Sequence, residues 1–287
     1  MTFSSHRPAP SPEAYPVQPF DHEDWTIRTV RPLGASAIYS LVPLGNFLLA
    51  VDRLRGFLLQ IDPATDNTTI VNPETTAVLV NATGLSIWED TLWFTRDQGV
   101  YCCPGAIQAG TIRSLQPQLF IRLPFRADGV AVWQSTIYVT CVEAGAILVF
   151  NRQAQEITRF YAPGVGQENL TVWEEELWVC DQTEQTVYCL ERGTGEVKFS
   201  VLTPFESPCG LTWYQHPQTG KKLLYVAYSS DELYIFDNPN SEPQYQLAKR
   251  DRTFIHPLHC HYYASEKYAT SYGYLVEMSY VEEIEPL

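Results

Sequence analysis

Two acidic residues, Asp128 and Glu168, stand at equivalent places in a repeated sequence pattern. Each lies two residues before a hydrophobic anchor of the repeat, Val130 or Leu170. Two carboxylates that converge in this way can bind a hard divalent cation or share a proton. Each could equally accept hydrogen bonds from the backbone of its own turn, because Asp-Gly sequences favour turns. The spacing leaves both interpretations open.

A second candidate cluster lies near the C-terminus. It consists of His256, His259, Cys260 and His261. A strand would present His259 and His261 on one face, where both imidazoles could reach one metal or one substrate. Histidines that only hydrogen-bond to backbone are commoner. If His259 occupies the position equivalent to Asp128 and Glu168, the three side chains face the central channel together. If Leu258 occupies that position instead, His259 does not join them.

Short β-strands in a long repeat must position these residues. The anchors of the repeat are Leu85, Val130, Leu170 and Leu211, spaced by 45, 40 and 41 residues. Around each anchor, apolar residues alternate with polar ones in short runs that turn-like clusters separate. A period of about 40 residues is typical of a β-propeller with about four antiparallel strands in each blade.

Counting the repeats predicts an all-β, six-bladed β-propeller of four-stranded antiparallel blades. The predicted blades are residues 35–73, 74–124, 125–163, 164–204, 205–252 and 253–280. The segment 25–32 resembles the outer strand that precedes each later anchor. We therefore expect it to join the last blade and close the ring, because a long open edge would invite aggregation. Residues 1–22 are predicted to be a disordered, Pro-rich lead-in, and 23–287 a single domain.

Two further features carry structural expectations. The aromatic residues three positions after the anchors are expected to wedge between blades; they are Trp88, Trp133, Trp173 and Tyr214. The acidic run 174–176 is expected to be a solvated hairpin tip.

The composition restricts partners and compartment. A net charge of -14 and a pI near 4.8 argue against nucleic acid and anionic membranes, since both recruit Lys and Arg. We expect a small-molecule substrate or a protein partner. Seven cysteines without framework spacing, and no visible export signal or membrane span, predict free thiols and a cytoplasmic location. No nucleotide cofactor is expected, because neither G-x-G-x-x-G nor a Walker sequence occurs.

A family resemblance begins at two short stretches. Arg126-Ala127-Asp128-Gly129-Val130 and Ser207-Pro208-Cys209-Gly210-Leu211 are similar to the "P-D/N-G-hydrophobic" step of the six-bladed propellers of the SMP-30/gluconolactonase and NHL type. The resemblance spans residues 35–280 as a repeat pattern. It implies a divalent cation (Ca²⁺, Mg²⁺, Mn²⁺ or Zn²⁺), held in the central channel by carboxylates and amides, and an acidic residue that activates water.

The resemblance also assigns roles to single residues. It implies that the channel-facing positions are Thr83, Asp128, Glu168 and Cys209. Asp128 and Glu168 would hold the metal, and Glu168 and His259 would be catalytic. The substrate pocket would add Thr83, Cys209, His256 and His261. The sequence departs from the family where 34–38 offers no glutamate ligand and where a thiol replaces an oxygen donor.

Three functions follow as hypotheses. The first is a small-molecule enzyme with its site at the central channel, a metal-assisted, lactonase-like hydrolase. The second is a non-catalytic propeller whose loops bind a ligand or a protein. The third is a lyase or cyclase of a biosynthetic pathway, because propeller channels also host chemistry that no motif reveals.

Overall fold

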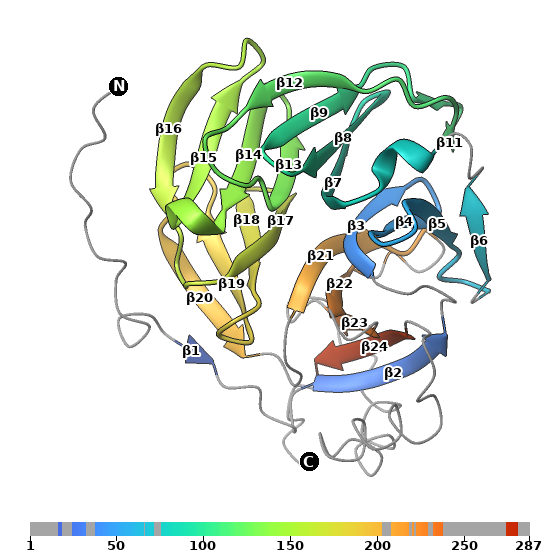
Figure 1. Ribbon diagram of the computed structural model, residues 1–287. Coiled ribbons are helices and arrows are strands. Elements are labelled where there is room, and N and C mark those ends of the chain that lie inside the picture. The colour runs from blue at the N-terminus through green and yellow to red at the C-terminus, as the bar shows by residue number, and fades with distance from the viewer. Residues whose placement is uncertain are drawn as a thin grey trace.

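The protein is an all-β propeller built from antiparallel sheets around a common centre (Figure 1). The computed structural model describes residues 17–18, 25–32, 38–65, 67–71, 76–202, 208–217, 220, 222–228, 232–237 and 274–280. Within these residues, five sheets have four or five strands each, and one further sheet is a two-stranded hairpin.

Each sheet takes strands that follow one another along the chain. The first holds β3 (Ile38–Leu44), β4 (Phe47–Asp52), β5 (Phe57–Ile61) and β6 (Thr68–Val71). The second holds β7 (Ala82–Trp88), β8 (Thr91–Arg96), β9 (Gly99–Cys103) and β12 (Gln118–Arg122). The third holds β13 (Gly129–Trp133), β14 (Thr136–Cys141), β15 (Ala146–Asn151) and β16 (Glu156–Tyr161). The fourth holds β17 (Gln167–Trp173), β18 (Glu176–Asp181), β19 (Thr186–Glu191) and β20 (Val197–Leu202).

The fifth sheet is assembled from both ends of the chain. It holds β21 (Pro208–Gln215), β22 (Lys222–Tyr228), β23 (Glu232–Asp237), β24 (Tyr274–Tyr280) and β2 (Trp25–Pro32). The pairing of 25–32 as the outermost strand of the last sheet confirms the predicted closure by an N-terminal strand. The second sheet also carries an insertion, in which β10 (Ile107–Gln108) pairs with β11 (Thr111–Ile112).

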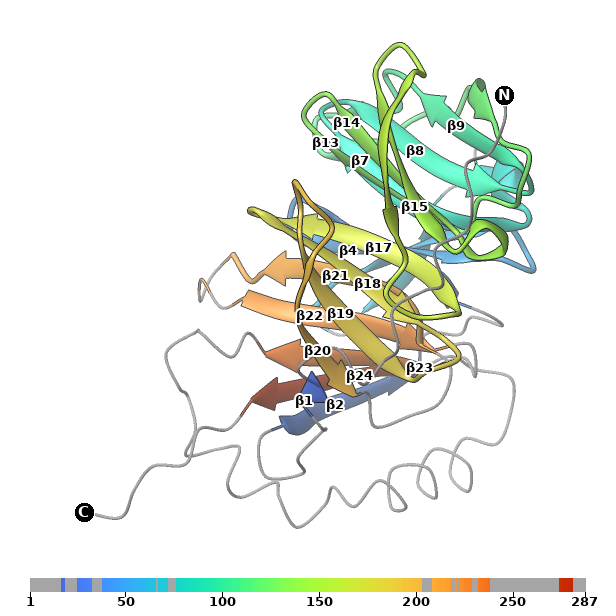
Figure 2. The same ribbon diagram turned by 90° about the vertical axis from the view of Figure 1, so that its left-hand side faces the viewer.

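The innermost strands of the five sheets form a closed ring. Each of β3, β7, β13, β17 and β21 contacts the next, and β21 contacts β3 (Figures 1 and 2). The prediction of six blades is therefore wrong for the described part of the chain. The physical reason is the pairing of β24, which lies parallel to β23 and adds to the fifth sheet instead of opening a sixth. Residues 253–273 of the predicted last blade lie outside the described residues.

One short strand lies within the predicted lead-in. Val17–Gln18 forms β1, which pairs in parallel with β20. This pairing covers part of the outer edge of the fourth sheet. The other residues of 1–22 lie outside the described residues.

The core lies between neighbouring sheets. One apolar cluster lies between the fifth and first sheets. Three more lie between the first and second, the second and third, and the third and fourth sheets. The anchors Leu85, Val130, Leu170 and Leu211 are all buried in it or beside it. Middle strands such as β15 are buried on both faces, which explains their continuous apolar sequence.

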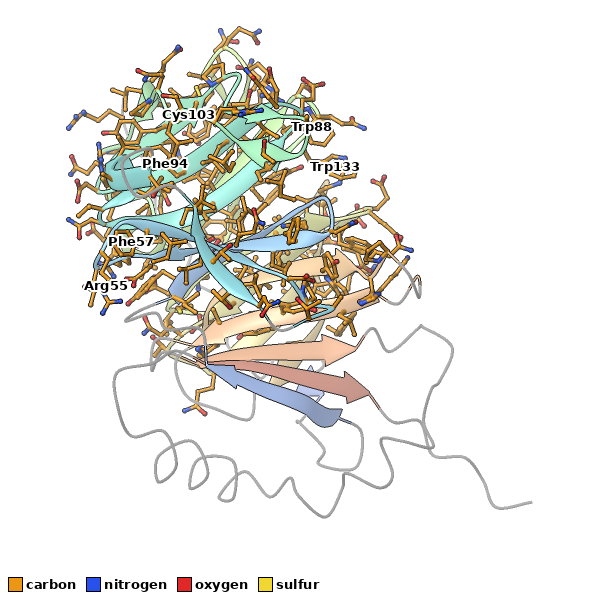
Figure 3. All side chains as sticks on the ribbon, turned by 90° about the vertical axis from the view of Figure 1, so that its right-hand side faces the viewer. Arg55, Phe57, Trp88, Phe94, Cys103 and Trp133 are labelled. Atoms are coloured by element: carbon orange, nitrogen blue, oxygen red, sulfur yellow. The ribbon has the colours of Figure 1, made fainter. Side chains whose placement is uncertain are left out.

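The hairpins between first and second strands place aromatic rings at one end of the molecule. Glu89, Gln134 and Glu174 each follow an inner strand with a φ of 52° to 56°, at the first position of a two-residue hairpin loop. The rings of Trp88 and Trp133 meet edge to face with centroids 5.4 Å apart, which confirms the predicted inter-blade wedge. Figure 3 shows these two rings on the opposite side of the molecule from Arg55 and its loop.

The cysteines bear out the expectation of free thiols where the structure describes them. Cys102, Cys103, Cys141, Cys180, Cys189 and Cys209 are all free, and all but the first are buried. Cys260 lies outside the described residues. The described part of the chain contains no helix long and apolar enough to cross a membrane.

Candidate active site at the propeller axis

The inner strands approach one another so closely that only glycine fits at the step before the anchors Leu85, Val130 and Leu211. A Cβ atom on Gly129 would lie 2.7 Å from the Cα of Asn169, and one on Gly210 would lie 2.6 Å from the carbonyl oxygen of Tyr39. The same holds for Gly84, whose Cβ would lie 2.7 Å from the amide of Val130. The recurrent glycine of the repeat is therefore explained by backbone contact at the axis.

Asn169 stands where the other blades have glycine, and its side chain crosses the centre. Its Nδ2 donates to the carbonyl oxygens of Tyr39, at 3.1 Å, and Thr83, at 2.9 Å. Those carbonyls belong to β3 and β7, neither of which is adjacent to β17 in the ring. The amide of Leu170 donates to the Oδ1 of Asn169 at 2.9 Å, so the whole side chain is engaged. This residue ties three blades together at the axis.

Two of the predicted pocket residues have structural partners. Thr83 is buried, and its hydroxyl lies 3.1 Å from that of Thr95 and donates to the carbonyl of Ala127 at 3.3 Å. The Cys209 thiol is fully buried and donates to the carbonyl of Ile38 at 3.2 Å. Both side chains therefore join neighbouring strands. The other predicted site residues from the last unit, His256, His259 and His261, lie outside the described residues.

The structure brings Asp128 and Glu168 to the same end of the axis, with Arg126 between them. Asp128 is buried, and both of its oxygens have polar partners: Arg126 Nε forms an ion pair with Oδ1 at 2.9 Å, and the Val142 amide donates a hydrogen bond to Oδ2 at 3.0 Å. The guanidinium reaches Glu168 less closely, with Nη2 and Oε2 separated by 3.9 Å. Asp128 is thus satisfied by its own turn and by Arg126, while Glu168 is not.

Other buried carboxylates show how a purely structural acid behaves in this fold. Asp181 accepts four hydrogen bonds, from the amides of Gly166, Thr183 and Glu184 and from the side chain of Gln167. By contrast, the Oε2 of Glu168 is buried and receives no hydrogen bond from the described residues. A buried carboxylate oxygen in this condition is costly unless it is protonated or meets a ligand.

Burial dominates the electrostatics of Glu168. It raises the pKa of this carboxyl to about 7, the nearby Asp128 adds to the rise, and Arg126 and Arg53 oppose it. The pKa of Asp128 is also raised by burial, while the Val142 amide and Arg126 pull it down. Glu168 is therefore the group of the pair that exchanges a proton near neutral pH.

Three members of the site, Tyr39, Arg53 and Arg126, were missed by reasoning from the sequence. Arg53 follows β4, and its guanidinium carbon lies 4.6 Å from the ring centroid of Tyr39, in β3. Burial raises the pKa of Tyr39, and both Cys209 and Glu168 contribute to that rise. We call the following five residues the axial cluster: Tyr39, Arg53, Arg126, Asp128 and Glu168. The sequence could have indicated Arg126, because it lies only two residues before the candidate site residue Asp128.

The axial cluster does not fit the divalent cation that the family resemblance implies. Both oxygens of Asp128 already have partners, one in the ion pair with Arg126 and one in the hydrogen bond from Val142, and the amide of Asn169 faces backbone carbonyls. Arg126 already brings a positive charge to the two carboxylates. Among the described residues, no three His, Cys, Asp or Glu side chains are grouped to hold a metal ion. The donor set is too small for a cation that takes six to eight oxygen ligands.

Comparison with known proteins supports the fold. No protein-family model and no curated protein matches the sequence. Among solved structures, glutaminyl cyclase of Myxococcus xanthus is similar with a TM-score of 0.51 and 12% identity, over 70% of this chain and 91% of that one. Regucalcin, a calcium-binding protein of Agrobacterium tumefaciens strain C58, has a TM-score of 0.49 and 10% identity, over 74% of this chain and 87% of that one. A streptogramin B lyase has a TM-score of 0.42 and 11% identity, over 76% and 74%. At 12% identity, the likeness to the glutaminyl cyclase shows the propeller fold alone.

Proposed function

We propose that this propeller is a small-molecule hydrolase in which Glu168 acts as a general base without a metal ion. The observation that carries the proposal is the buried Oε2 of Glu168, which receives no hydrogen bond from the described residues and lies 3.9 Å from a guanidinium nitrogen of Arg126. A carboxyl whose pKa lies near 7 is well matched to proton transfer at neutral pH.

The reaction would be hydrolysis of an ester or lactone. Ionised Glu168 takes a proton from water as the water oxygen attacks the carbonyl carbon, and the oxyanion that forms is stabilised by the guanidinium of Arg126. When the intermediate collapses, the carbon–oxygen bond to the leaving group breaks. Protonated Glu168 then returns its proton to the departing alkoxide, so the carboxylate is regenerated. Asp128 holds Arg126 in place through their ion pair, with Arg126 Nε and Asp128 Oδ1 2.9 Å apart, and is a positioning residue.

A screen of nitrophenyl esters and aliphatic lactones, run in the presence of a chelator, tests this proposal. We expect turnover whose kcat/KM rises with pH and levels off above about 7, because the base must be ionised. Glu168→Gln should lower kcat/KM by about 100-fold or more, while Glu143→Gln, an exposed acid on the neighbouring loop, should not change it.

Turnover that disappears with the chelator, or that Glu168→Gln retains while folded, would overturn the proposal. The absence of turnover throughout the screen would favour the non-catalytic propeller that binds a ligand or a protein. A lyase or cyclase would use the same Glu168 carboxyl. Its products, unlike those of a hydrolase, would contain no added water.

A further inference from the structure

The charges of the axial cluster do not balance. Two guanidinium groups, Arg53 and Arg126, come from different blades and flank Glu168. Asp128 forms an ion pair with one of them, with Arg126 Nε and Asp128 Oδ1 2.9 Å apart. The guanidinium of Arg53 lies over the neutral ring of Tyr39. With Glu168 protonated, the five residues of the axial cluster carry one net positive charge in a chain whose net charge is -14, and the charge of the nearby Asp181 is met by the four hydrogen bonds that it accepts.

Solvent reaches both arginines. The side chain of Arg126 is 39% exposed, and Arg53 is also partly exposed, whereas Asp128 beneath them is only 2% exposed. A guanidinium offers several N–H donors in a fixed plane, which matches the two oxygens of a carboxylate. Arg53 lies flat on the Tyr39 ring, so its orientation is restricted before any ligand arrives.

The surroundings of the arginines suit an organic anion. Leu54, Val80 and Val165 are 65%, 40% and 59% exposed. Leu54 follows Arg53 directly, and Asn81, next to Val80, donates its amide to the carbonyl of Arg53 at 3.0 Å. Val165 lies in the loop that leads to Glu168. Charged donors beside exposed aliphatic side chains favour a ligand that has both an acidic group and apolar carbon.

We infer that the substrate carries a carboxylate, which Arg53 and Arg126 bind from two blades beside Glu168. This inference rests on the proposed function and names its substrate class: an ester or lactone that also bears a free carboxylate. A bound monoanion would neutralise the cluster and would favour the protonated form of Glu168. Binding is therefore linked to proton uptake near neutral pH.

Four charged groups act on Glu168: Arg53, Arg126, Asp128 and Asp181. The charge of Glu168 acts in turn on Tyr39 and Cys180. Burial raises the pKa of Glu168 most, the two carboxylates raise it further, and the two arginines lower it. Near neutral pH, a bound anion would favour the protonated form of Glu168.

The experiment measures binding of acetate, hexanoate and benzoate to the full chain by titration calorimetry, with benzamide as the neutral control. We expect saturable binding of at least one carboxylate, no binding of benzamide, and affinity that rises at least threefold when the pH is lowered by about one unit through 7. Arg53→Met should weaken binding tenfold or more, and Arg53→Lys should weaken it less. Arg122→Met, an exposed arginine of β12, is the matched control and should bind as the wild type does.

The outcomes separate this inference from the proposed function. Glu168→Gln should still bind the carboxylate but lose the pH dependence, and it should lose turnover. Turnover that depends on Glu168 without binding of any of the three carboxylates would overturn the inference alone. Equal binding of benzamide and benzoate, or unchanged binding in folded Arg53→Met, would also overturn it. Carboxylate binding together with turnover that survives Glu168→Gln would overturn the proposed function and keep the carboxylate site.

Discussion

Arg126 Nη2 and Glu168 Oε2 lie 3.9 Å apart, whereas Arg126 Nε lies only 2.9 Å from Asp128 Oδ1. The Arg126 guanidinium thus lies closer to Asp128 than to Glu168. The closer carboxylate is satisfied and positions the arginine, while the more distant one remains available for protonation. This asymmetry is what distinguishes Glu168 from the structural acids of the fold.

Removal of that guanidinium tests its role. Arg126→Met leaves Asp128 buried with a single hydrogen bond, so we expect the free energy of unfolding at about pH 7 to fall by about 1–3 kcal/mol, a range reduced because Arg126 is partly exposed. At about pH 4 the loss should shrink, because the raised pKa of Asp128 allows it to take up a proton. Chemical denaturation at both pH values measures the difference. Arg122→Met is the control, and an equal loss in the two variants would contradict the role.

Stability should also depend on pH through Glu168. Its folded pKa of about 7 lies above its ordinary value of 4.5, so the unfolded chain releases this proton first. The favourable contribution is complete below about pH 4.5 and is lost as the pH rises through about 7, a change of roughly 3 kcal/mol. Glu168→Gln should remove that slope, and Glu196→Gln, an exposed acid of another hairpin, should keep it. Identical slopes in all three proteins would refute the burial argument.

The sequence was sufficient to predict the repeat, the buried anchors and the joining of 25–32 to the last sheet. Asp128 and Glu168 stand at the same step of the repeat, and in the structure both lie near the guanidinium of Arg126. The number of blades was not predictable in the same way, because it depends on whether β24 pairs with β23 or starts a new sheet. Both pairings satisfy the same pattern of apolar residues, so periodicity alone cannot choose between them.

The roles of Arg53 and Tyr39 illustrate a different limit. Arg53 follows β4, outside the step before an anchor, while Tyr39 occupies the same bulge in β3 that Glu168 occupies in β17. Both residues belong to another blade from Glu168. Their approach depends on how tightly the ring closes, which the glycines at the axis determine. The sequence shows those glycines as a motif, but their meaning as contact points emerges only when the strands are placed together.

Asn169 provides a test of that ring closure. Asn169→Ala removes the donor to the carbonyls of Tyr39 and Thr83 and the acceptor for the amide of Leu170. We expect a loss of about 2–4 kcal/mol, since buried polar groups would lose their partners. Asn151→Ala, whose bonds lie within an exposed turn, should lose at most about 1 kcal/mol. Urea denaturation compares the two, and equal losses would mean that the axis contributes little.

Divalent cations should not stabilise the wild-type protein. A ligand that binds only the folded state raises the melting temperature as its concentration rises. Because Arg126 already brings positive charge to Asp128 and Glu168, we expect no change with millimolar Ca²⁺, Mg²⁺, Mn²⁺ or Zn²⁺. A rise that Asp128→Asn or Glu168→Gln abolishes would restore the metal-assisted hydrolase.

Glu168 should hold its proton up to near-neutral pH, and an NMR titration measures the protonation of this carboxyl. In protein labelled with ¹³C at glutamate, the carboxyl resonance of Glu168 is assigned by its absence in Glu168→Gln and followed as the pH is raised. We expect a midpoint near 7 for this resonance. A midpoint in the ordinary range of about 4–5 would contradict it.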